Sequence, residues 1–199
     1  MDEIRLIIGL GNPELEYGLT RHNAGFWALN IIAQRNKAIW TSEPKFRSEI
    51  SKIYIGSPIQ RCVWLLKPSL YMNESGEAVG KFCFFHKIQP YEILVVHDEL
   101  DLLPGVLKLK KGGGNAGHNG LKNIQNKLQS SNFWRLRIGI GHPRTTETKI
   151  KNVSNFVLSK PTSNEKEKID QCIDLCVNYV DEILKGEMKI IKDAIDKEK

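Results

Sequence analysis

Short apolar runs along the chain alternate with longer segments in which apolar residues recur every three or four positions. The short runs are rich in β-branched residues and predict buried strands at residues 6–8, 93–96 and 133–140. The longer segments predict amphipathic helices at residues 26–33, 79–86, 121–128, 169–184 and 188–195. Strands that alternate with helices predict an α/β fold, with a mixed, mostly parallel central sheet and helices on both faces.

Three further segments complete the expected topology. Residues 46–54 and 62–66 predict the strands of a hairpin, with Gly56-Ser57-Pro58 as its turn. The alternation in Lys108-Leu109-Lys110 predicts a strand with one basic face, and residues 153–158 predict a strand at a sheet edge. The sequence shows no domain boundary. We therefore expect residues 1–199 to form one domain, in which residues 164–199 are C-terminal helices that pack near the cleft.

Composition narrows the class of protein. A chain of 199 residues can bury roughly 70% of its unfolded surface in one domain. Four cysteines without metal-ligand spacing predict reduced thiols, and neither an export signal nor a membrane span is recognisable, so we expect a soluble, cytoplasmic protein. We also expect it to be a monomer. A formal net charge of +6 permits a polyanionic partner without proving one.

Polar side chains follow several of the predicted strands and one glycine-rich loop. They are Asn12 and His22 after the first strand, Asn73 after the hairpin, Asp98 after residues 93–96, and His118 and Asn119 within the glycine-rich stretch 112–120. The carboxyl ends of parallel strands meet at one edge of a sheet, so these side chains are expected to gather there. A histidine oriented by a carboxylate is a general base, and asparagine amides can hold a carbonyl or stabilise an oxyanion.

Other chemistries fit the same stretches less well. The chain has no G-x-S-x-G elbow and no cysteine near these loops, so water is the expected nucleophile. Gly9-Leu10-Gly11 begins like a dinucleotide-binding fingerprint, but Glu14 stands where the third glycine belongs. A metal site at His22, Asp98 and His118 is the weaker alternative because no helix-spaced ligand pair accompanies them. We expect the remaining histidines to be structural, namely His86, His97 and His142.

Several motifs occur in one order along the chain. They are Gly9-Leu10-Gly11-Asn12-Pro13 with Tyr17 and residues 20–25, Lys67-Pro68 with Tyr71-Met72-Asn73, residues 97–101, residues 112–121 and residues 135–143. In order and spacing, from Ile7 to about Pro161, the chain resembles bacterial peptidyl-tRNA hydrolases. One departure is Glu14, where that family usually has glycine.

The resemblance implies hydrolysis of the ester that joins a peptide to tRNA, which recycles tRNA from prematurely released chains, without a metal or other cofactor. It assigns His22 as the base that activates water, Asp98 as the carboxylate that orients it, and Asn12 as a catalytic amide that positions the ester. It assigns peptide and substrate contacts to Tyr17, Tyr71, Met72, Asn73, His118 and Asn119, and tRNA phosphate contacts to Lys108, Lys110 and Arg137. A non-catalytic RNA-binding protein on the same fold is the alternative, and a metal-dependent peptidase is a more distant one. Because the chain keeps both His22 and Asp98, we favour the hydrolase.

Overall fold

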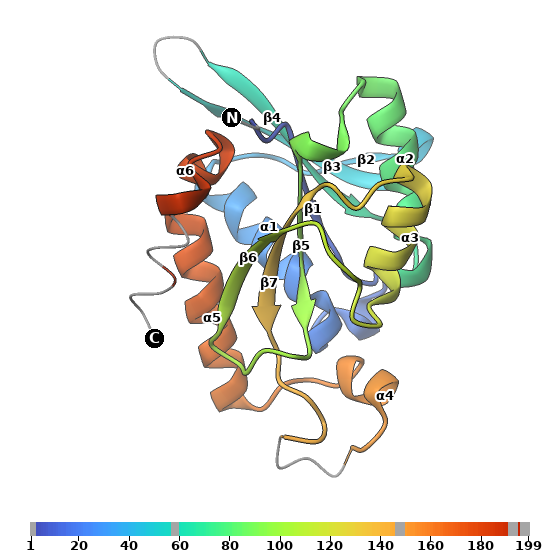
Figure 1. Cartoon of the computed structure of the whole chain (residues 1–199), viewed down its shortest axis with the longest axis vertical. Helices are drawn as coiled ribbons and strands as arrows, with labels where there is room; N and C mark the ends of the chain where they lie inside the picture. Colours follow the sequence, from blue (N-terminus) through green and yellow to red (C-terminus); the bar gives the residue numbers. More distant parts are fainter. Residues whose placement is uncertain (1–2, 57–59, 146–149, 191–194, 196–199) are drawn as a thin grey trace.

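The computed structural model describes residues 3–56, 60–145, 150–190 and 195, and within them seven strands form one sheet of order β2-β3-β4-β1-β5-β7-β6 (Figure 1). The strands are β1 (Leu6–Gly9), β2 (Thr41–Glu43), β3 (Ser48–Ile55), β4 (Arg61–Pro68), β5 (Ile93–Glu99), β6 (Leu107–Lys111) and β7 (Trp134–Gly139). The four central strands, β4, β1, β5 and β7, run parallel, whereas β2, β3 and β6 pair antiparallel at the two edges. The sequence prediction of a mixed sheet with a parallel centre is confirmed.

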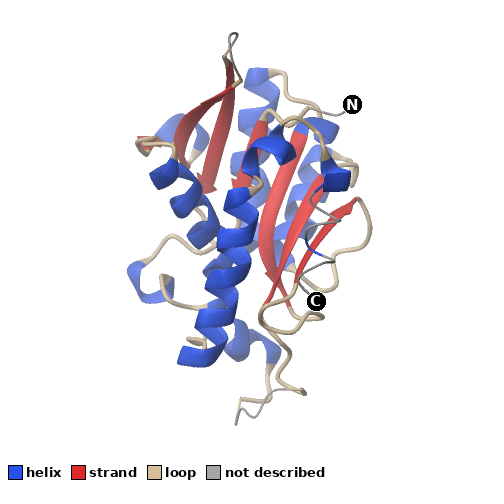
Figure 2. Ribbon diagram, turned by 90° about the vertical axis from the view of Figure 1, so that its left-hand side faces the viewer, coloured by secondary structure: helices blue, strands red, loops and turns tan. Residues whose placement is uncertain are grey.

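Helices cover both faces of this sheet and make a three-layer α/β/α arrangement. They are α1 (Ala24–Arg35), α2 (Ser75–His86), α3 (Asn119–Leu128), α4 (Val153–Val157), α5 (Ser163–Asn178) and α6 (Val180–Leu184). On β1, Ile7 packs into the core with α1 and α5, whereas Leu6 and Ile8 pack into the core with α2 and α3. Figure 2 shows the long helix α5 in front of the strands, on the side of the sheet away from α2 and α3. The period-two alternation of a strand thus divides one apolar run between two cores.

A crevice is expected at the carboxyl end of strand β1. Its parallel neighbours are β4 on one side and β5 on the other, so the connections on its two sides lead away in opposite directions. Ligands bind at such a switch point, beyond the carboxyl ends of the strands. Three short 3₁₀ turns lie in the loops after β1 and β4: η1 (Leu15–Tyr17), η2 (Arg21–Asn23) and η4 (Met72–Glu74).

Gly25 lets helix α1 approach the central strands closely. A Cβ atom on Gly25 would lie 2.3 Å from the carbonyl oxygen of Val96 and 2.5 Å from the backbone nitrogen of Leu10. A side chain at this position would therefore push α1, and with it the preceding η2 turn, away from the sheet. Gly9 acts in the same way, because its Cβ atom would lie 2.7 Å from the carbonyl oxygen of Gly25.

The structure corrects two of the predicted elements. Residues 153–158 do not form an edge strand: Val153–Val157 is helix α4, and the side chain of Asn152 caps it by accepting a hydrogen bond from the backbone N–H of Asn155 at 3.2 Å. Residues 169–184 are not one helix, because the backbone departs from helical geometry at Tyr179 (φ −106°, ψ 17°) and separates α5 from α6. The apolar spacing continues across this break, which is why the sequence pattern did not reveal it.

Smaller differences concern the hairpin and the chain end. Phe46, predicted as the start of a strand, belongs to the 3₁₀ turn η3 (Pro44–Phe46), and β3 starts at Ser48. The predicted turn at Gly56-Ser57-Pro58 and most of the predicted helix 188–195 lie outside the described residues. Among the helices that the structure does describe, none is both long and apolar enough to cross a membrane.

Candidate active site

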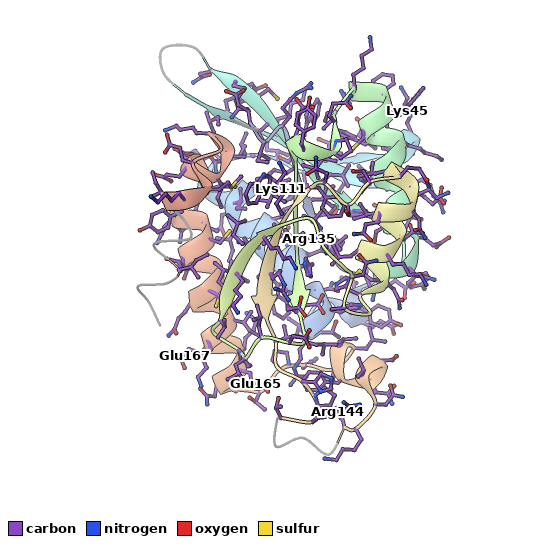
Figure 3. The ribbon with its side chains drawn as sticks, in the orientation of Figure 1. Lys45, Lys111, Arg135, Arg144, Glu165 and Glu167 are labelled. Atoms are coloured by element: carbon purple, nitrogen blue, oxygen red, sulfur yellow. The ribbon has the colours of Figure 1, made fainter. Side chains whose placement is uncertain are left out.

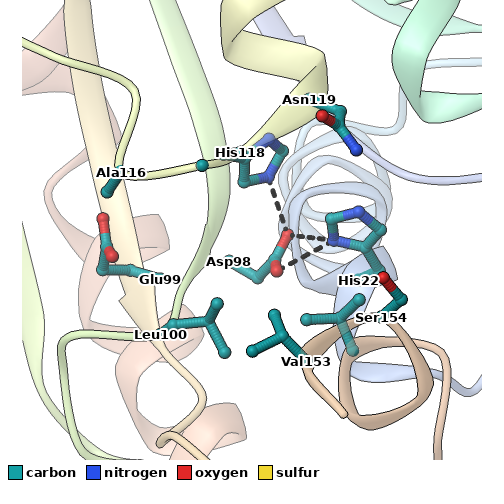
Figure 4. A pocket seen from close by; sticks show the side chains of 11 residues that line it. His22, Asp98, Glu99, Leu100, Ala116, His118, Asn119, Val153 and Ser154 are labelled. Carbon is teal, nitrogen blue, oxygen red and sulfur yellow. Dashed lines mark hydrogen bonds and ion pairs between the residues drawn. The ribbon is translucent and has the colours of Figure 1, made fainter.

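Asp98 stands at the end of β5 between two imidazole rings (Figure 4). Its carboxylate oxygens lie 2.9 and 3.0 Å from Nδ1 of His22, and one of them lies 3.0 Å from Nε2 of His118. The Asp98 side chain is 2% exposed, against 12% for His22 and 8% for His118. Three residues that the sequence placed on separate loops therefore form one cluster at the carboxyl end of the sheet.

The hydrogen bonds assign the proton positions of the two rings. The backbone N–H of Leu121 donates to Nδ1 of His118 at 3.4 Å, so the proton of His118 is on Nε2 and is donated to Asp98. In His22 the ring nitrogen that faces Asp98 is Nδ1. Its Nε2 therefore remains to accept a proton from a molecule in the cleft, which is the arrangement that a general base requires.

Electrostatics favour a charged Asp98 and a more basic His22. Burial alone lowers the pKa of His22, but the charge of Asp98 and its hydrogen bond outweigh burial and raise the pKa above its usual 6.5. Burial also opposes ionisation of Asp98, yet the two neighbouring rings hold the pKa of this carboxyl well below its usual range. The pair is thus suited to accept a proton near neutral pH.

His97 is a buried neighbour of this cluster. Its Nδ1–H donates to the carbonyl oxygen of Asp98 at 2.6 Å, and its ring packs edge-on against His118 with centroids 5.0 Å apart. Burial, together with the nearby His118, lowers the pKa of His97 to about 3, so this ring is neutral. These contacts agree with the structural role predicted for it.

Asn12 is held in place by hydrogen bonds on three of its groups. Its backbone N–H and C=O bind the side chain of Asn23 at 2.9 and 3.0 Å, and its Oδ1 accepts the backbone N–H of Met72 at 2.8 Å. Because Oδ1 is engaged by Met72, the Nδ2 group is left as a donor for the cleft. Asn23 was not singled out from the sequence, and its place directly after His22 was the available signal.

A cleft of about 320 Å³ beside His22 brings together the predicted peptide and substrate contacts other than His118, which lines the adjoining cavity instead. It is lined by Asn12, Tyr17, His22, Tyr71, Met72, Asn73, Asn119, Ser154, Val157 and Leu158. A smaller cavity of about 90 Å³ adjoins it and is lined by His22, Asp98 and His118, among others. The hydroxyl of Tyr71, which lines the cleft, donates to the carboxylate of Glu14. Glu14, the one noted departure from the family motif, thus has a hydrogen-bond partner.

One wall of the cleft was missed by the sequence reasoning. Ser154, Val157 and Leu158 come from helix α4 and the residue after it, the segment predicted as an edge strand. The spacing of Val153, Phe156 and Val157 fits one face of a helix and could have indicated that this segment is helical. A run this short does not distinguish a helix from a strand by pattern alone.

The predicted basic strand forms as expected. On β6, Lys108 and Lys110 are exposed, whereas Leu107 and Leu109 are buried. Lys108 pairs with Arg137 of β7 across the sheet, and Nε of Arg137 binds Glu99 at 2.8 Å, so this arginine is already partly neutralised. Glu99 directly follows Asp98, and Figure 4 shows it beside the same cavity.

Arg135 is a further basic residue beside the basic strand, but unlike Lys108 and Lys110 it is buried. It lies opposite Lys110, between the strands and the glycine loop (Figure 3). Its side chain is buried and donates to the carbonyl oxygens of Gly113 and Gly114 at 2.7 and 2.6 Å. Arg135 therefore fixes the glycine loop that leads to His118.

His22, Asp98 and His118 also satisfy the simplest requirement for a metal site. One ligand atom from each lies within 4.8 Å of the others, among the residues that the structure describes. Nδ1 of His22 and Nε2 of His118 each already form a hydrogen bond with the Asp98 carboxylate. Geometry alone thus allows either a base paired with a carboxylate or a metal held by three ligands.

Comparisons with known proteins agree on one family. A sequence model of the peptidyl-tRNA hydrolase family matches residues 6–199. The peptidyl-tRNA hydrolase of Bordetella avium is 50% identical over 186 residues, which cover 94% of this chain and 88% of that protein. That of a Marinomonas species is 46% identical and covers 98% of this chain and 97% of its own length. The crystal structure of the peptidyl-tRNA hydrolase of Acinetobacter baumannii superposes with a TM-score of 0.88 at 43% identity, over 98% of this chain and 95% of that one.

Proposed function

The chain belongs to the peptidyl-tRNA hydrolase family, and we propose that it hydrolyses the ester between peptide and tRNA by means of a water molecule that His22 activates. The family makes the chain a hydrolase that acts on peptidyl-tRNA. The observation that carries the mechanism is the His22–Asp98 pair at 2.9 Å, which opens onto the cleft.

The reaction proceeds as general base catalysis. Nε2 of His22 takes a proton from water while the water oxygen attacks the ester carbonyl, and the charge of Asp98 stabilises the imidazolium that results. When the tetrahedral intermediate collapses, the bond to the ribose 3′ oxygen breaks and the imidazolium returns the proton to that oxygen. An ester expels an alkoxide more readily than a peptide bond expels its amide anion, so a base and well-placed donors suffice without a covalent intermediate.

We assign the asparagine side chains of the cleft to contacts with the ester carbonyl, the attacking water and the peptide. Asn12 lines the cleft with its Oδ1 engaged by Met72, so we assign its Nδ2 to the ester carbonyl, where charge develops. Asn73 is assigned to the peptide, and Asn119 to the attacking water or the peptide backbone. Tyr17, Tyr71 and Met72 form walls of the cleft. Contacts to the peptide backbone use groups that every residue shares, which suits an enzyme that accepts many peptide sequences.

His118 supports the base indirectly. Its Nε2–H binds the same carboxylate as His22, at 3.0 Å, and its ring lies 5.0 Å from that of His22. We propose that His118 holds the Asp98 carboxylate in place, next to Asn119, the residue assigned to the peptide or the water.

The basic strand is assigned to tRNA. Lys108, Lys110 and Arg137 lie on neighbouring strands, and Glu99 links Arg137 to the segment that carries Asp98. Phosphate contacts of this kind release counterions and make binding depend on salt. Because this substrate arises in translation, we further propose that the protein is cytoplasmic, and we propose that it is a monomer. We likewise propose that residues 1–199 form one domain, in which residues 164–199 are C-terminal helices that pack near the cleft.

A cleavage assay tests this function. The purified wild-type protein is incubated with N-blocked peptidyl-tRNA, with and without a metal chelator, and release of peptide from tRNA is measured. Equal rapid cleavage in both samples is expected. Binding of tRNA without cleavage would support the RNA-binding alternative instead. Loss of cleavage in chelator, restored by added zinc, would indicate that His22, Asp98 and His118 bind a metal ion.

A further inference from the structure

Arg21 lies next to His22 but points away from the cleft. Its side chain is only 4% exposed, and its guanidinium lies 4.2 Å from the ring centroid of Phe156. Its backbone N–H also donates to the carbonyl oxygen of Ser159 at 3.1 Å. Donors of a buried arginine are costly to leave unpaired, and the partners of the two terminal nitrogens of Arg21 come from a segment more than a hundred residues away.

The guanidinium binds the end of one helix and the start of the next. Nη1 donates to the carbonyl oxygens of Phe156, Ser159 and Lys160 at 3.4, 3.3 and 2.9 Å, and to the Ser159 hydroxyl at 2.6 Å. Phe156 lies in the last turn of α4, whereas Ser159 and Lys160 lie in the segment that follows this helix. Nη2 pairs with Glu165 at 2.7 Å.

Glu165 has a second task at the start of α5, where Figure 3 shows it. Its carboxylate also accepts the backbone N–H of Thr162 at 2.7 Å and completes a capping box. One planar guanidinium therefore joins the C-terminal end of α4, the N-terminal end of α5 and the turn that carries His22. A lysine ammonium lacks this forked geometry.

Helix α4 needs such an anchor. It has only five residues, and a helix of that length has little stability of its own. It nevertheless supplies Ser154 and Val157 to the cleft, opposite the loops of Asn12 and Asn119. The width of the cleft beside His22 thus depends on contacts outside α4.

We propose that Arg21 is a positioning residue for the hydrolysis: its guanidinium fixes the α4 wall of the cleft relative to His22. The inference rests on the proposed function. It assigns Arg21 no contact with substrate, so its effect passes through the placement of the peptide between α4 and the asparagine loops. Losses in its variants should therefore be the same for full-length peptidyl-tRNA and for a short ester that carries only the terminal nucleotide.

The test compares Arg21→Lys and Glu165→Gln with Asp174→Asn as a matched control. Asp174 pairs with Arg35 at 2.8 Å, on an exposed part of the same helix α5 and away from α4. For Arg21→Lys, assayed well below its melting temperature, we expect kcat/KM to fall about tenfold or more on both substrates. The acid limb of the pH profile should stay in place, because the His22–Asp98 pair is intact. Glu165→Gln should give a smaller loss in the same direction, and the control should remain within about twofold of the wild type.

Amide hydrogen exchange supplies the readout that does not depend on activity. Exchange over residues 153–160 should become roughly tenfold faster in Arg21→Lys and unchanged in the control. Unchanged exchange, or faster exchange with wild-type kcat/KM, would overturn the proposal, as would a loss accompanied by a shifted acid limb. A wild-type protein without hydrolase activity would instead overturn the proposed function, while the exchange data would still decide whether Arg21 anchors α4.

Discussion

Nδ1 of His22 lies within 3.0 Å of both carboxylate oxygens of Asp98. This contact fixes the orientation of the His22 ring and leaves Nε2 for the cleft. His118 binds the same carboxylate from the other side at 3.0 Å, so the base and its partner are held as a three-residue unit.

Asp98→Asn should change both the rate and its pH dependence. His22 acts as a base when neutral, and Asp98 raises its pKa above 6.5, so wild-type kcat/KM should decline as the pH falls through a value above 6.5. In the variant the charge is gone while burial remains, so the acid limb should move to lower pH. We also expect kcat to fall by about a hundredfold to ten-thousandfold. A pH–rate profile measures both, and an unmoved acid limb would contradict the pairing.

Asn12→Asp should reduce kcat while the fold is kept. The new carboxylate can still accept the backbone N–H of Met72, but it cannot donate to the ester carbonyl. Loss of one such donor costs about a hundredfold or more in kcat. Asn123→Asp is the matched control, because its Oδ1 also accepts a backbone N–H, that of Gly76 at 2.7 Å, away from the cleft. Equal losses in the two variants would remove Asn12 from the reaction.

Lys110→Ala should affect long and short substrates differently. We expect KM for full-length peptidyl-tRNA to rise, and the slope of log Kd for tRNA against log salt concentration to fall in magnitude by about 1. A short ester with only the terminal nucleotide should be hydrolysed as before. Lys81→Ala, an exposed lysine on α2, is the control and should leave KM unchanged. A similar loss on both substrates would argue against a phosphate contact of Lys110.

Gly25→Ala should destabilise the fold through the close approach of α1 to the sheet. The added Cβ would lie 2.3 Å from the carbonyl oxygen of Val96, and forced packing of this kind costs roughly 3 kcal/mol of unfolding free energy. Gly80→Ala in α2 is the control, since its Cβ would meet only Cβ of Lys127 at 3.5 Å. This control should stabilise the protein by about 0.5–1 kcal/mol through helix propensity. Urea denaturation measures both changes, and equal stabilities would refute the packing argument.

The parts of the fold that the sequence predicted are those that local patterns determine. Runs such as Leu6-Ile7-Ile8 are buried on both faces of the sheet, and a continuous apolar run reports that burial directly. The same logic led from the end of β5 to Asp98, because parallel strands place their ends at one edge. It does not explain His118, because β6 runs antiparallel to β7 and ends beside the start of that strand, and the glycine loop then carries the chain to the N-terminal end of α3.

The parts that could not be predicted depend on contacts between distant segments. The partners of Arg21 lie 135 to 144 positions further along the chain, and no local pattern encodes them. The pairing of Arg137 with Glu99 depends on the register of β5 with β7. Helix α4 could not be predicted because five residues are too few to show the spacing of a helix. The break at Tyr179 could not be predicted because the apolar spacing of a helix continues through it.

The most direct test of the account is single-turnover cleavage of peptidyl-tRNA by His22→Ala, with tRNA affinity measured on the same preparation. We expect nearly all cleavage to be lost while tRNA affinity stays close to that of the wild type, because the basic strand is untouched. Cleavage at the wild-type rate in this variant would contradict His22 as the base.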